Sequence, residues 1–268
     1  MPTVVCDGVT VNYHDVGSGD TVVLIHCSSS SLRQWRSLWE LLQNKYRIIA
    51  IDMLDWGETD AWIKTCENLL IDETNLIKEV ISGIDESIHL VGHSYGGTIA
   101  YHLAMTSPTK IKSLTLIEPM LGWLLDPKKE AKHHSELRGV AEYFWEKYSI
   151  GKAKEGIEYY FDYWNGDGAW RNLDKGLSDY VLAGAEKNFH EFEAIFEGGK
   201  ALSKPEYFKQ PVLLIGGAES QQPPLRILEL LEGMFPNSRR HLIKGASHMS
   251  PITHSDHVNL IIRNFLST

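Results

Sequence analysis

A serine, a histidine and a carboxylate in this chain have the types and surroundings needed for nucleophilic catalysis. Ser94 lies in Gly92-His93-Ser94-Tyr95-Gly96-Gly97, between a short β-branched run and a stretch that favours helix. A serine hydroxyl is a weak nucleophile until a base takes its proton, and histidine is the side chain that titrates near neutrality without help. The chain has 12 histidines, so their positions in the fold must decide which one serves as the base.

The segment around Ser94 predicts a nucleophile elbow. A Gly-x-Ser-x-Gly on a strand-to-helix turn forces so sharp a bend that the central side chain stands clear of the backbone. Side chains at positions 92 or 96 would collide with the neighbouring strand and helix, so glycine is needed there. The N–H groups at the start of the next helix would stabilise negative charge at the same place. The pattern also occurs by chance, but the strand, the helix and the third glycine favour a nucleophile over a bystander serine.

The elements that must position these residues predict a mostly parallel, doubly wound α/β sheet. After an alternating edge strand at 9–16, continuous apolar runs indicate strands buried on both faces. We expect these strands at 21–25, 46–51, 87–91, 112–117 and 211–215, and a last strand at 239–243. Helical periodicity falls between them, at 32–44, 71–84, 98–105, 225–234 and 255–266.

The sheet pattern is interrupted by residues 119–204, which contain no clear strand but hold 15 of the 27 aromatic residues. We therefore predict a core domain formed by residues 1–118 and 205–268 and a helical cap inserted at 119–204. The aromatic side chains would pack as the core of this cap and also roof an apolar pocket.

His248 is the favoured base because it follows the last predicted strand, in Gly245-Ala246-Ser247-His248. Its loop should reach the carboxyl edge of the sheet near Ser94; His26 and His93 are weaker candidates. The segment 26–31 is a polar loop at the end of a buried strand, where α/β sheets place ligands. Its backbone N–H groups could face a developing oxyanion, although four consecutive serines are also typical of a flexible loop.

Three features follow one another along the chain: the loop His26-Cys27-Ser28, the turn around Ser94 and the segment Gly245-Ala246-Ser247-His248. With them in this order, the chain resembles a capped member of the α/β-hydrolase superfamily over essentially its full length. The resemblance implies an oxyanion hole formed by the backbone N–H groups of Ser28 and Tyr95; for Tyr95, the position after the nucleophile implies the same. It also implies that His26 orders the oxyanion loop. Many relatives have His-Gly where this chain has His26-Cys27, so the freedom of a glycine is missing here.

The acid departs from the commonest pattern of that superfamily. Many relatives have Gly-x-x-Asp after the next-to-last strand, whereas this chain has Gly217-Ala218-Glu219-Ser220. The acid could be Glu219, one position earlier, or Glu118, at the end of the strand after the elbow helix. Some branches of the superfamily, haloalkane dehalogenases among them, use the second location. We favour Glu118, because it starts on the correct edge of the sheet and is one methylene longer than aspartate, and keep Glu219 as the alternative.

Composition limits the partners and the compartment. The net charge of -9 and the pI near 5.7 argue against nucleic acid and anionic membranes as partners. Cys6, Cys27 and Cys66 form neither a disulfide framework nor a metal-binding pattern. No signal peptide or membrane-spanning apolar run is visible. We expect a cytoplasmic protein that acts on a small molecule without a cofactor or metal; its oligomeric state stays open.

The predicted function is that of a serine hydrolase that cleaves carboxylic esters or thioesters of a small apolar substrate through an acyl-enzyme on Ser94. Two alternatives remain at this point. The same triad could hydrolyse a C–C bond next to a ketone or open a lactone, or the fold could be a non-catalytic binding protein with a vestigial triad. Serine at the elbow argues against haloalkane dehalogenases and epoxide hydrolases, which need a carboxylate nucleophile.

Overall fold

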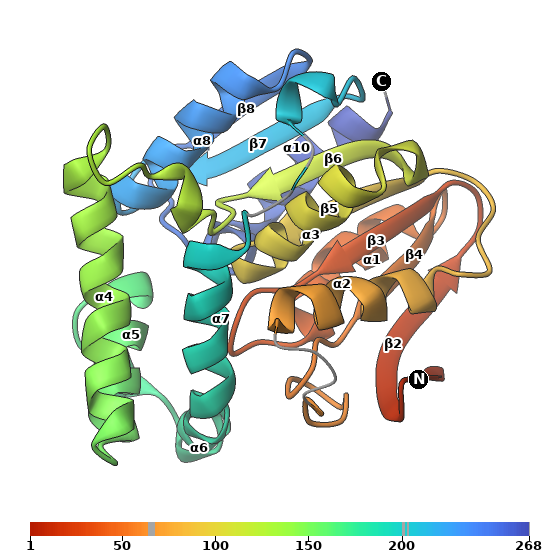
Figure 1. Ribbon diagram of the computed structural model, residues 1–268. Helices are drawn as coiled ribbons and strands as arrows, with labels where there is room; N and C mark the ends of the chain where they lie inside the picture. Colours follow the sequence, from red (N-terminus) through yellow and green to blue (C-terminus); the bar gives the residue numbers. More distant parts are fainter. Residues whose placement is uncertain (64–67, 200–201, 203, 268) are drawn as a thin grey trace.

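An eight-stranded, mostly parallel sheet runs through the molecule in the order β1-β2-β4-β3-β5-β6-β7-β8 (Figure 1). The computed structural model describes residues 1–63, 68–199, 202 and 204–267, so Cys66 lies outside the described residues. β1 and β2 run antiparallel to their neighbours, and the other strands pair in parallel. The strands are Thr3–Cys6 (β1), Val9–Gly17 (β2), Thr21–Ile25 (β3), Arg47–Ile51 (β4), Ile88–His93 (β5), Ile111–Ile117 (β6), Val212–Gly217 (β7) and Ser238–Ile243 (β8). The predicted fold class is confirmed.

The sequence-based prediction missed β1, the edge strand that pairs with β2. The turn between them is Asp7-Gly8, and both residues have positive φ, 47° and 86°. An Asp-Gly pair with this backbone is the usual two-residue hairpin turn. The Asp-Gly pair was therefore a usable signal for a hairpin at the start of the chain.

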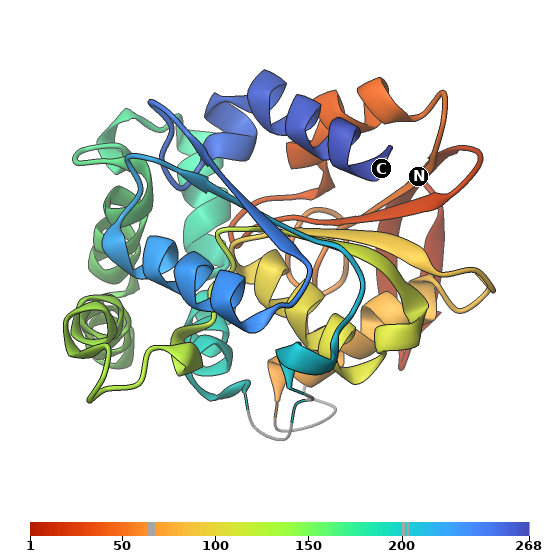
Figure 2. The same ribbon diagram turned by 90° about the horizontal axis from the view of Figure 1, so that it is seen from above.

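Helices cover both faces of the sheet (Figure 2). One face packs against α1 (Arg36–Leu42) and α10 (Ser255–Leu266), and the other against α2 (Leu69–Val80), α3 (Tyr95–Thr106) and α8 (Gln222–Met234). Every residue of β3, β5 and β7 is buried. The continuous apolar runs that predicted these strands are therefore explained by burial on both faces.

Four helices are inserted between β6 and β7 and lie beyond the carboxyl ends of these strands (Figure 1). They are α4 (Ala131–Ser149), α5 (Ala153–Asn165), α6 (Lys175–Ala183) and α7 (Ala185–Glu197). Some of their aromatic side chains pack on one another, as Phe144, Tyr160 and Phe192 do at ring-centroid separations of 5.6–6.3 Å. The helical insertion is confirmed, and the ends of the cap domain at 119 and 204 stay a prediction.

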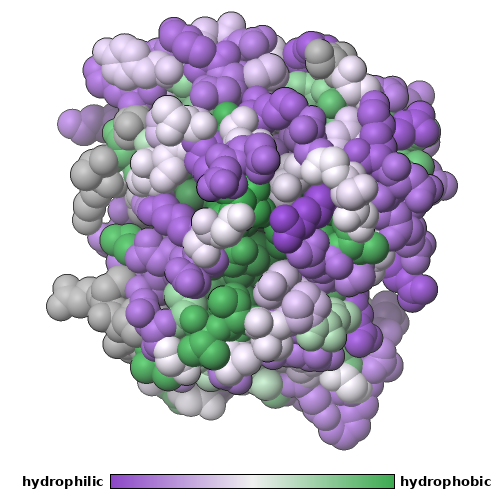
Figure 3. Space-filling model, turned by 90° about the vertical axis from the view of Figure 1, so that its right-hand side faces the viewer, coloured by the Kyte–Doolittle hydropathy of each residue, from purple (hydrophilic) through white to green (hydrophobic). Residues whose placement is uncertain are grey.

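The side of the molecule away from the inserted helices, which faces the viewer in Figure 3, is mostly hydrophilic with a hydrophobic strip across its middle. Some exposed apolar side chains are normal on protein surfaces. Within residues 1–63, 68–199 and 204–267, no helix combines the length and apolar character needed to cross a bilayer.

Candidate active site

Ser94 occupies the turn between β5 and α3 in a strained conformation, with φ 55° and ψ -121°. Its N–H donates to the Ile117 carbonyl at 2.9 Å, which ties the turn to the neighbouring strand β6. A Cβ on Gly92 would lie 2.3 Å from the Gly96 carbonyl oxygen, and a Cβ on Gly96 would lie 2.2 Å from that of His26. The sharp turn therefore requires glycine at both positions, for the steric reason predicted from the sequence.

An unbroken chain of hydrogen bonds joins Ser94, His248 and Glu118. His248 lies in the loop between β8 and the short helix α9 (Ser250–Thr253), with its Nε2 2.9 Å from Ser94 Oγ. Its Nδ1 lies 2.7 Å from Glu118 Oε2. Because a carboxylate oxygen only accepts, Nδ1 carries the proton that it donates to Glu118 and Nε2 is left to accept the serine proton. The exposed fractions of Ser94, His248 and Glu118 are 7%, 2% and 0%.

Glu118 follows β6 directly, and hydrogen bonds hold both its backbone and its side chain in place. It has a φ of 41°, and its N–H donates to the Ile215 carbonyl at 3.0 Å. Its Oε1 accepts from the Gly217 N–H at 2.7 Å and from the Ser220 hydroxyl at 2.5 Å. The alternative acid, Glu219, is exposed. The structure thus brings Glu118 to His248 and turns Glu219 to the solvent.

His26 holds the predicted oxyanion loop in place. Its Nδ1–H donates to the Cys27 carbonyl at 2.7 Å, and its Nε2 accepts from the Met53 N–H at 3.1 Å. Burial lowers the pKa of His26 to about 4, so the ring is neutral, as these two bonds require. Cys27 N–H donates to Gln34 Oε1 at 3.2 Å, which fixes the next peptide in turn.

The backbone N–H groups of Ser28 and Tyr95 are the donors predicted for the oxyanion hole. Ser28 lies beside Ser94 in the wall of the same cavity, and Tyr95 is the first residue of α3. Within the part of the chain that the structure describes, neither N–H donates to a protein acceptor. Two free donors near a serine at a helix N-terminus are what binding of an oxyanion requires.

Two aromatic residues flank His248. The ring of Trp164, from α5, has its centroid 4.2 Å from that of His248 at an interplanar angle of 35°. On another side, His93 Nε2–H donates to the His248 carbonyl at 2.9 Å. Burial, and then the nearby His248, lower the pKa of His93, so His93 stays neutral. His26 and His93 therefore support the two loops of the site.

A cavity of about 1060 Å³ opens onto Ser94 and His248. Part of its lining is the polar loop of Ser28, Ser29, Ser30 and Ser31, together with Arg33 and Arg36. The cap supplies a more apolar part of the lining, with Tyr160, Phe161, Trp164, Leu173, Leu177, Tyr180 and Val181. The volume is suited to a small organic molecule. Among the described residues, no group of three histidine, cysteine or acidic side chains has an arrangement that could hold a metal ion.

Comparisons with known proteins bear on the fold of the chain. Residues 20–148 match the sequence profile of the family described as alpha/beta hydrolase fold. The chain has the α/β-hydrolase fold. This α/β hydrolase is 25% identical over 277 residues to the 2-hydroxy-6-oxononadienedioate/2-hydroxy-6-oxononatrienedioate hydrolase of Paraburkholderia xenovorans, covering 97% of this chain and 91% of that protein.

Solved structures of low sequence identity share the fold of this α/β hydrolase. A meta-cleavage product hydrolase from Pseudomonas fluorescens superposes with a TM-score of 0.72 at 21% identity, covering 100% of this chain and 97% of the other. An esterase from Exiguobacterium antarcticum superposes with a TM-score of 0.75 at 16% identity, covering 98% and 97% of the two chains. At these identities the likeness establishes the fold alone.

Several residues at the site of this α/β hydrolase were not singled out from its sequence. Ser220 was recognised only as the residue in the usual acid's place, and its bond to Glu118 was not foreseen. Trp164 is one of the aromatic residues of the segment 119–204, and nothing in the sequence links it to His248. Glu191 and Asn188, which reach the Ser94 region from α7, had no signal at all, because polar residues on a charged helix normally face the solvent.

Proposed function

We propose that this α/β hydrolase is a serine hydrolase that cleaves carboxylic esters or thioesters through an acyl-enzyme on Ser94. The observation that carries the proposal is the chain of hydrogen bonds from Glu118 through His248 to Ser94, at 2.7 and 2.9 Å. It combines a nucleophile, a base with the correct tautomer and an orienting carboxylate beside a cavity of suitable size.

The proposed reaction begins when Ser94 Oγ attacks the acyl carbon and His248 Nε2 takes the hydroxyl proton. Glu118 holds the imidazole in place and stabilises its positive charge. The Ser28 and Tyr95 N–H groups bind the oxyanion, and one such donor typically contributes about 2.7–4 kcal/mol to transition-state stabilisation. His248 then gives its proton to the leaving oxygen or sulfur atom. In the second half of the reaction, His248 takes a proton from a water molecule that attacks the acyl-enzyme, and it returns this proton to Ser94 Oγ as the acid leaves.

Cleavage of a C–C bond next to a ketone is the second candidate. The Paraburkholderia relative is named as a hydrolase of 2-hydroxy-6-oxononadienedioate, a molecule whose name contains a ketone and two carboxylates but no ester. Hydrolysis of such a molecule must break a bond between carbons. The proposed triad and oxyanion donors would serve that reaction too, because it also begins at a carbonyl carbon. Lactone opening uses the ester chemistry described above.

The substrate should be a small molecule with an apolar part, because the cap supplies an aromatic and aliphatic wall. A cytoplasmic location is favoured by the free thiols of Cys6 and Cys27, which fit a reducing compartment.

The test compares the parent with Ser94→Ala on phenyl esters of increasing acyl length and on a 2-hydroxy-6-oxo dienoate. Turnover of the esters that is lost in Ser94→Ala supports the esterase proposal. Turnover of the dienoate alone favours the C–C hydrolase. Background rates on both substrates, together with ligand binding that survives in Ser94→Ala, would instead identify a binding protein.

A further inference from the structure

A second, much smaller space lies on the inner side of Ser94. It has a volume of about 10 Å³, and Ser94, Ser28, Tyr160 and Trp164 line both this space and the large cavity. Its other lining residues are Met120 and four residues of α7. A space of this volume holds about one water molecule. We call it the inner pocket; it has room for a group the size of a hydroxyl or a methyl.

Two buried oxygen atoms without hydrogen-bond partners belong to residues that line the inner pocket. Glu191 and Asn188 have exposed fractions of 2% and 1%. Among the described residues, neither Glu191 Oε2 nor Asn188 Oδ1 has a hydrogen-bond partner. Both atoms can only accept. Because a buried acceptor without a donor costs roughly 1–3 kcal/mol, a donor from a ligand would be favoured here.

The other half of each side chain is already engaged, so neither can turn away. Glu191 Oε1 accepts from Trp56 Nε1 at 3.0 Å and lies 3.4 Å from Lys187 Nζ. Asn188 Nδ2 donates to Ser29 Oγ and to the Gly184 carbonyl, each at 3.2 Å.

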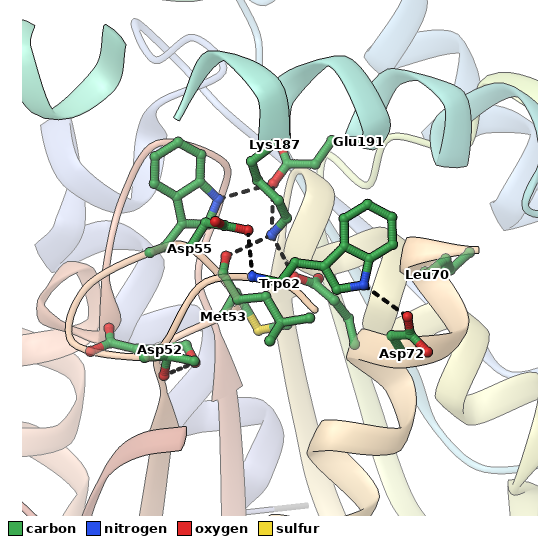
Figure 4. Close-up of polar contacts among 12 residues, drawn as sticks. Asp52, Met53, Asp55, Trp62, Leu70, Asp72, Lys187 and Glu191 are labelled. Atoms are coloured by element: carbon green, nitrogen blue, oxygen red, sulfur yellow. Dashed lines mark hydrogen bonds and ion pairs between the residues drawn. The ribbon is translucent and has the colours of Figure 1, made fainter. Parts of the chain in front are cut away.

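Lys187 projects from α7 toward the loop after β4, as Figure 4 shows. Its Nζ donates to Glu73 Oε1 at 2.5 Å and to the Leu54 carbonyl at 2.9 Å, besides its contact with Glu191. With three acceptors around it, the ammonium group holds Glu191 Oε1 and leaves Oε2 unpaired.

The position of His248 decides which half of a substrate meets these oxygen atoms. His248 lies in the wall of the large cavity, whereas the inner pocket lies against α7. The leaving group must receive its proton from His248, so it has to lie in the large cavity. The acyl group then points to the other side of Ser94, into the inner pocket.

We propose that the inner pocket is the acyl site and selects a short acyl chain that carries a hydroxyl group on the carbon next to the carbonyl. This inference rests on the proposed function, since it requires an acyl-enzyme on Ser94. The hydroxyl group would donate to Glu191 Oε2 or to Asn188 Oδ1. A neutral donor fits better than an ammonium group, because Lys187 already supplies a cation to Glu191 and burying a second cation is costly.

The test uses phenyl glycolate and phenyl propionate, which differ by a hydroxyl in place of a methyl of similar size. Each kcat/KM is divided by the rate constant for hydroxide-catalysed hydrolysis, because the two carbonyls differ in reactivity. We expect a corrected value at least about 10-fold higher for the glycolate, since propionate leaves the buried oxygens unpaired. Equal values, or a preference for propionate, would overturn the inference.

Glu191→Gln tests the residue directly. Trp56 and Lys187 are both donors, so the amide oxygen takes the place of Oε1 and the NH₂ group faces the inner pocket. Loss of the charged acceptor should lower the glycolate-to-propionate ratio about 5- to 10-fold. Glu193→Gln, two residues further on α7 and exposed, is the matched control and should keep the parental ratio. An unchanged ratio in Glu191→Gln would show that Glu191 does not select the hydroxyl group. If this variant does not fold, the glycolate-to-propionate ratio of the parent alone tests the inference.

A fluorophosphonate probe separates this inference from the function beneath it. If the probe labels Ser94 of the parent but the two esters are hydrolysed equally, only the inference is wrong. If Ser94 is not labelled and neither ester is hydrolysed, the proposed function fails and the inference fails with it.

Discussion

The Ser220 hydroxyl lies 2.5 Å from Glu118 Oε1, and the other oxygen of the same carboxylate lies 2.7 Å from His248 Nδ1. Ser220 occupies the place after β7 where many α/β hydrolases have their acid. It thus remains connected to His248, but through Glu118 from the neighbouring strand. With Gly217 N–H as a second donor to Oε1, the carboxylate is held in the orientation that meets the imidazole.

Glu118→Gln should lower kcat about 10⁴-fold, because an amide can stabilise the wrong imidazole tautomer and does not balance its charge. Glu219→Gln should leave kcat close to that of the parent, since Glu219 is exposed. Steady-state kinetics on the best ester of the panel measures both. Loss of turnover confined to Glu219→Gln would show that the acid has been assigned to the wrong residue.

Ser220→Ala should lower kcat by about 10-fold, because a hydrogen bond to a charged group is worth roughly 1.5–3 kcal/mol and Gly217 still holds the carboxylate. Ser220→Thr keeps the hydroxyl and should recover most of the activity. The comparison of kcat values in the three proteins gives the result. Equal losses in both variants would indicate that packing at position 220, rather than the bond to Glu118, is what matters.

Lys187→Met should destabilise the fold by about 3–5 kcal/mol, because it leaves Glu73 and Glu191 buried without a positive charge. The loss should be smaller when Glu73→Met is added. Urea unfolding gives the free energies, with Lys175→Met as the control. Lys175 pairs with Asp179 on the exposed face of α6, where an ion pair contributes about 0–1 kcal/mol. A Lys187→Met protein as stable as this control would contradict the role of the buried cation.

The stability of the protein should fall as the pH drops below about 6.5, where an unfolded histidine takes up a proton. Burial lowers the pKa of His26 to about 4 and that of His93 below its usual range, so the folded state binds these protons only at lower pH. Each such histidine removes up to about 1.4 kcal/mol of stability per pH unit on acidification. Glu73 acts in the opposite direction, because burial raises its pKa to about 7 and its ionisation costs stability as the pH rises.

Burial also lowers the pKa of His89 and of His102 to about 4, so the net effect of these histidines against the one carboxyl is a loss of stability on acidification. Urea unfolding between about pH 7 and pH 5 measures it. His93→Gln keeps a side-chain N–H for the His248 carbonyl, and we expect a shallower dependence on pH in this variant. Stability that rises toward pH 5 would contradict the assignment of neutral buried histidines.

Much of the fold was predictable because each buried strand is a continuous apolar run and each core helix has a clear period. Local patterns also located Ser94 and His248 on turns that end at one edge of the sheet. The preference for Glu118 over Glu219 rests on the sheet edge at which its strand ends, on the length of its side chain and on a location that some branches of the superfamily use. In the structure β5 and β6 pair side by side (Figure 1), so Ser94 and Glu118 follow neighbouring strands.

The inner face of α7 could not be predicted in the same way. Lys187 and Glu191 are four residues apart, a spacing that is typical of an ion pair on an exposed helix face. In the structure this pair is buried against Trp56 and Glu73, which come from elsewhere in the chain. The i,i+4 spacing therefore predicts an exposed pair, and only the tertiary structure shows that the pair is buried and that Glu191 lines a pocket.

The most direct test of the account is mass spectrometry of the protein after reaction with a fluorophosphonate probe. We predict a single adduct on the peptide that contains Ser94, formed by the parent, slowed by orders of magnitude in His248→Ala and absent in Ser94→Ala. A parent that is not labelled, or an adduct that persists in Ser94→Ala, would contradict the claim that Ser94 is a nucleophile activated by His248 and Glu118.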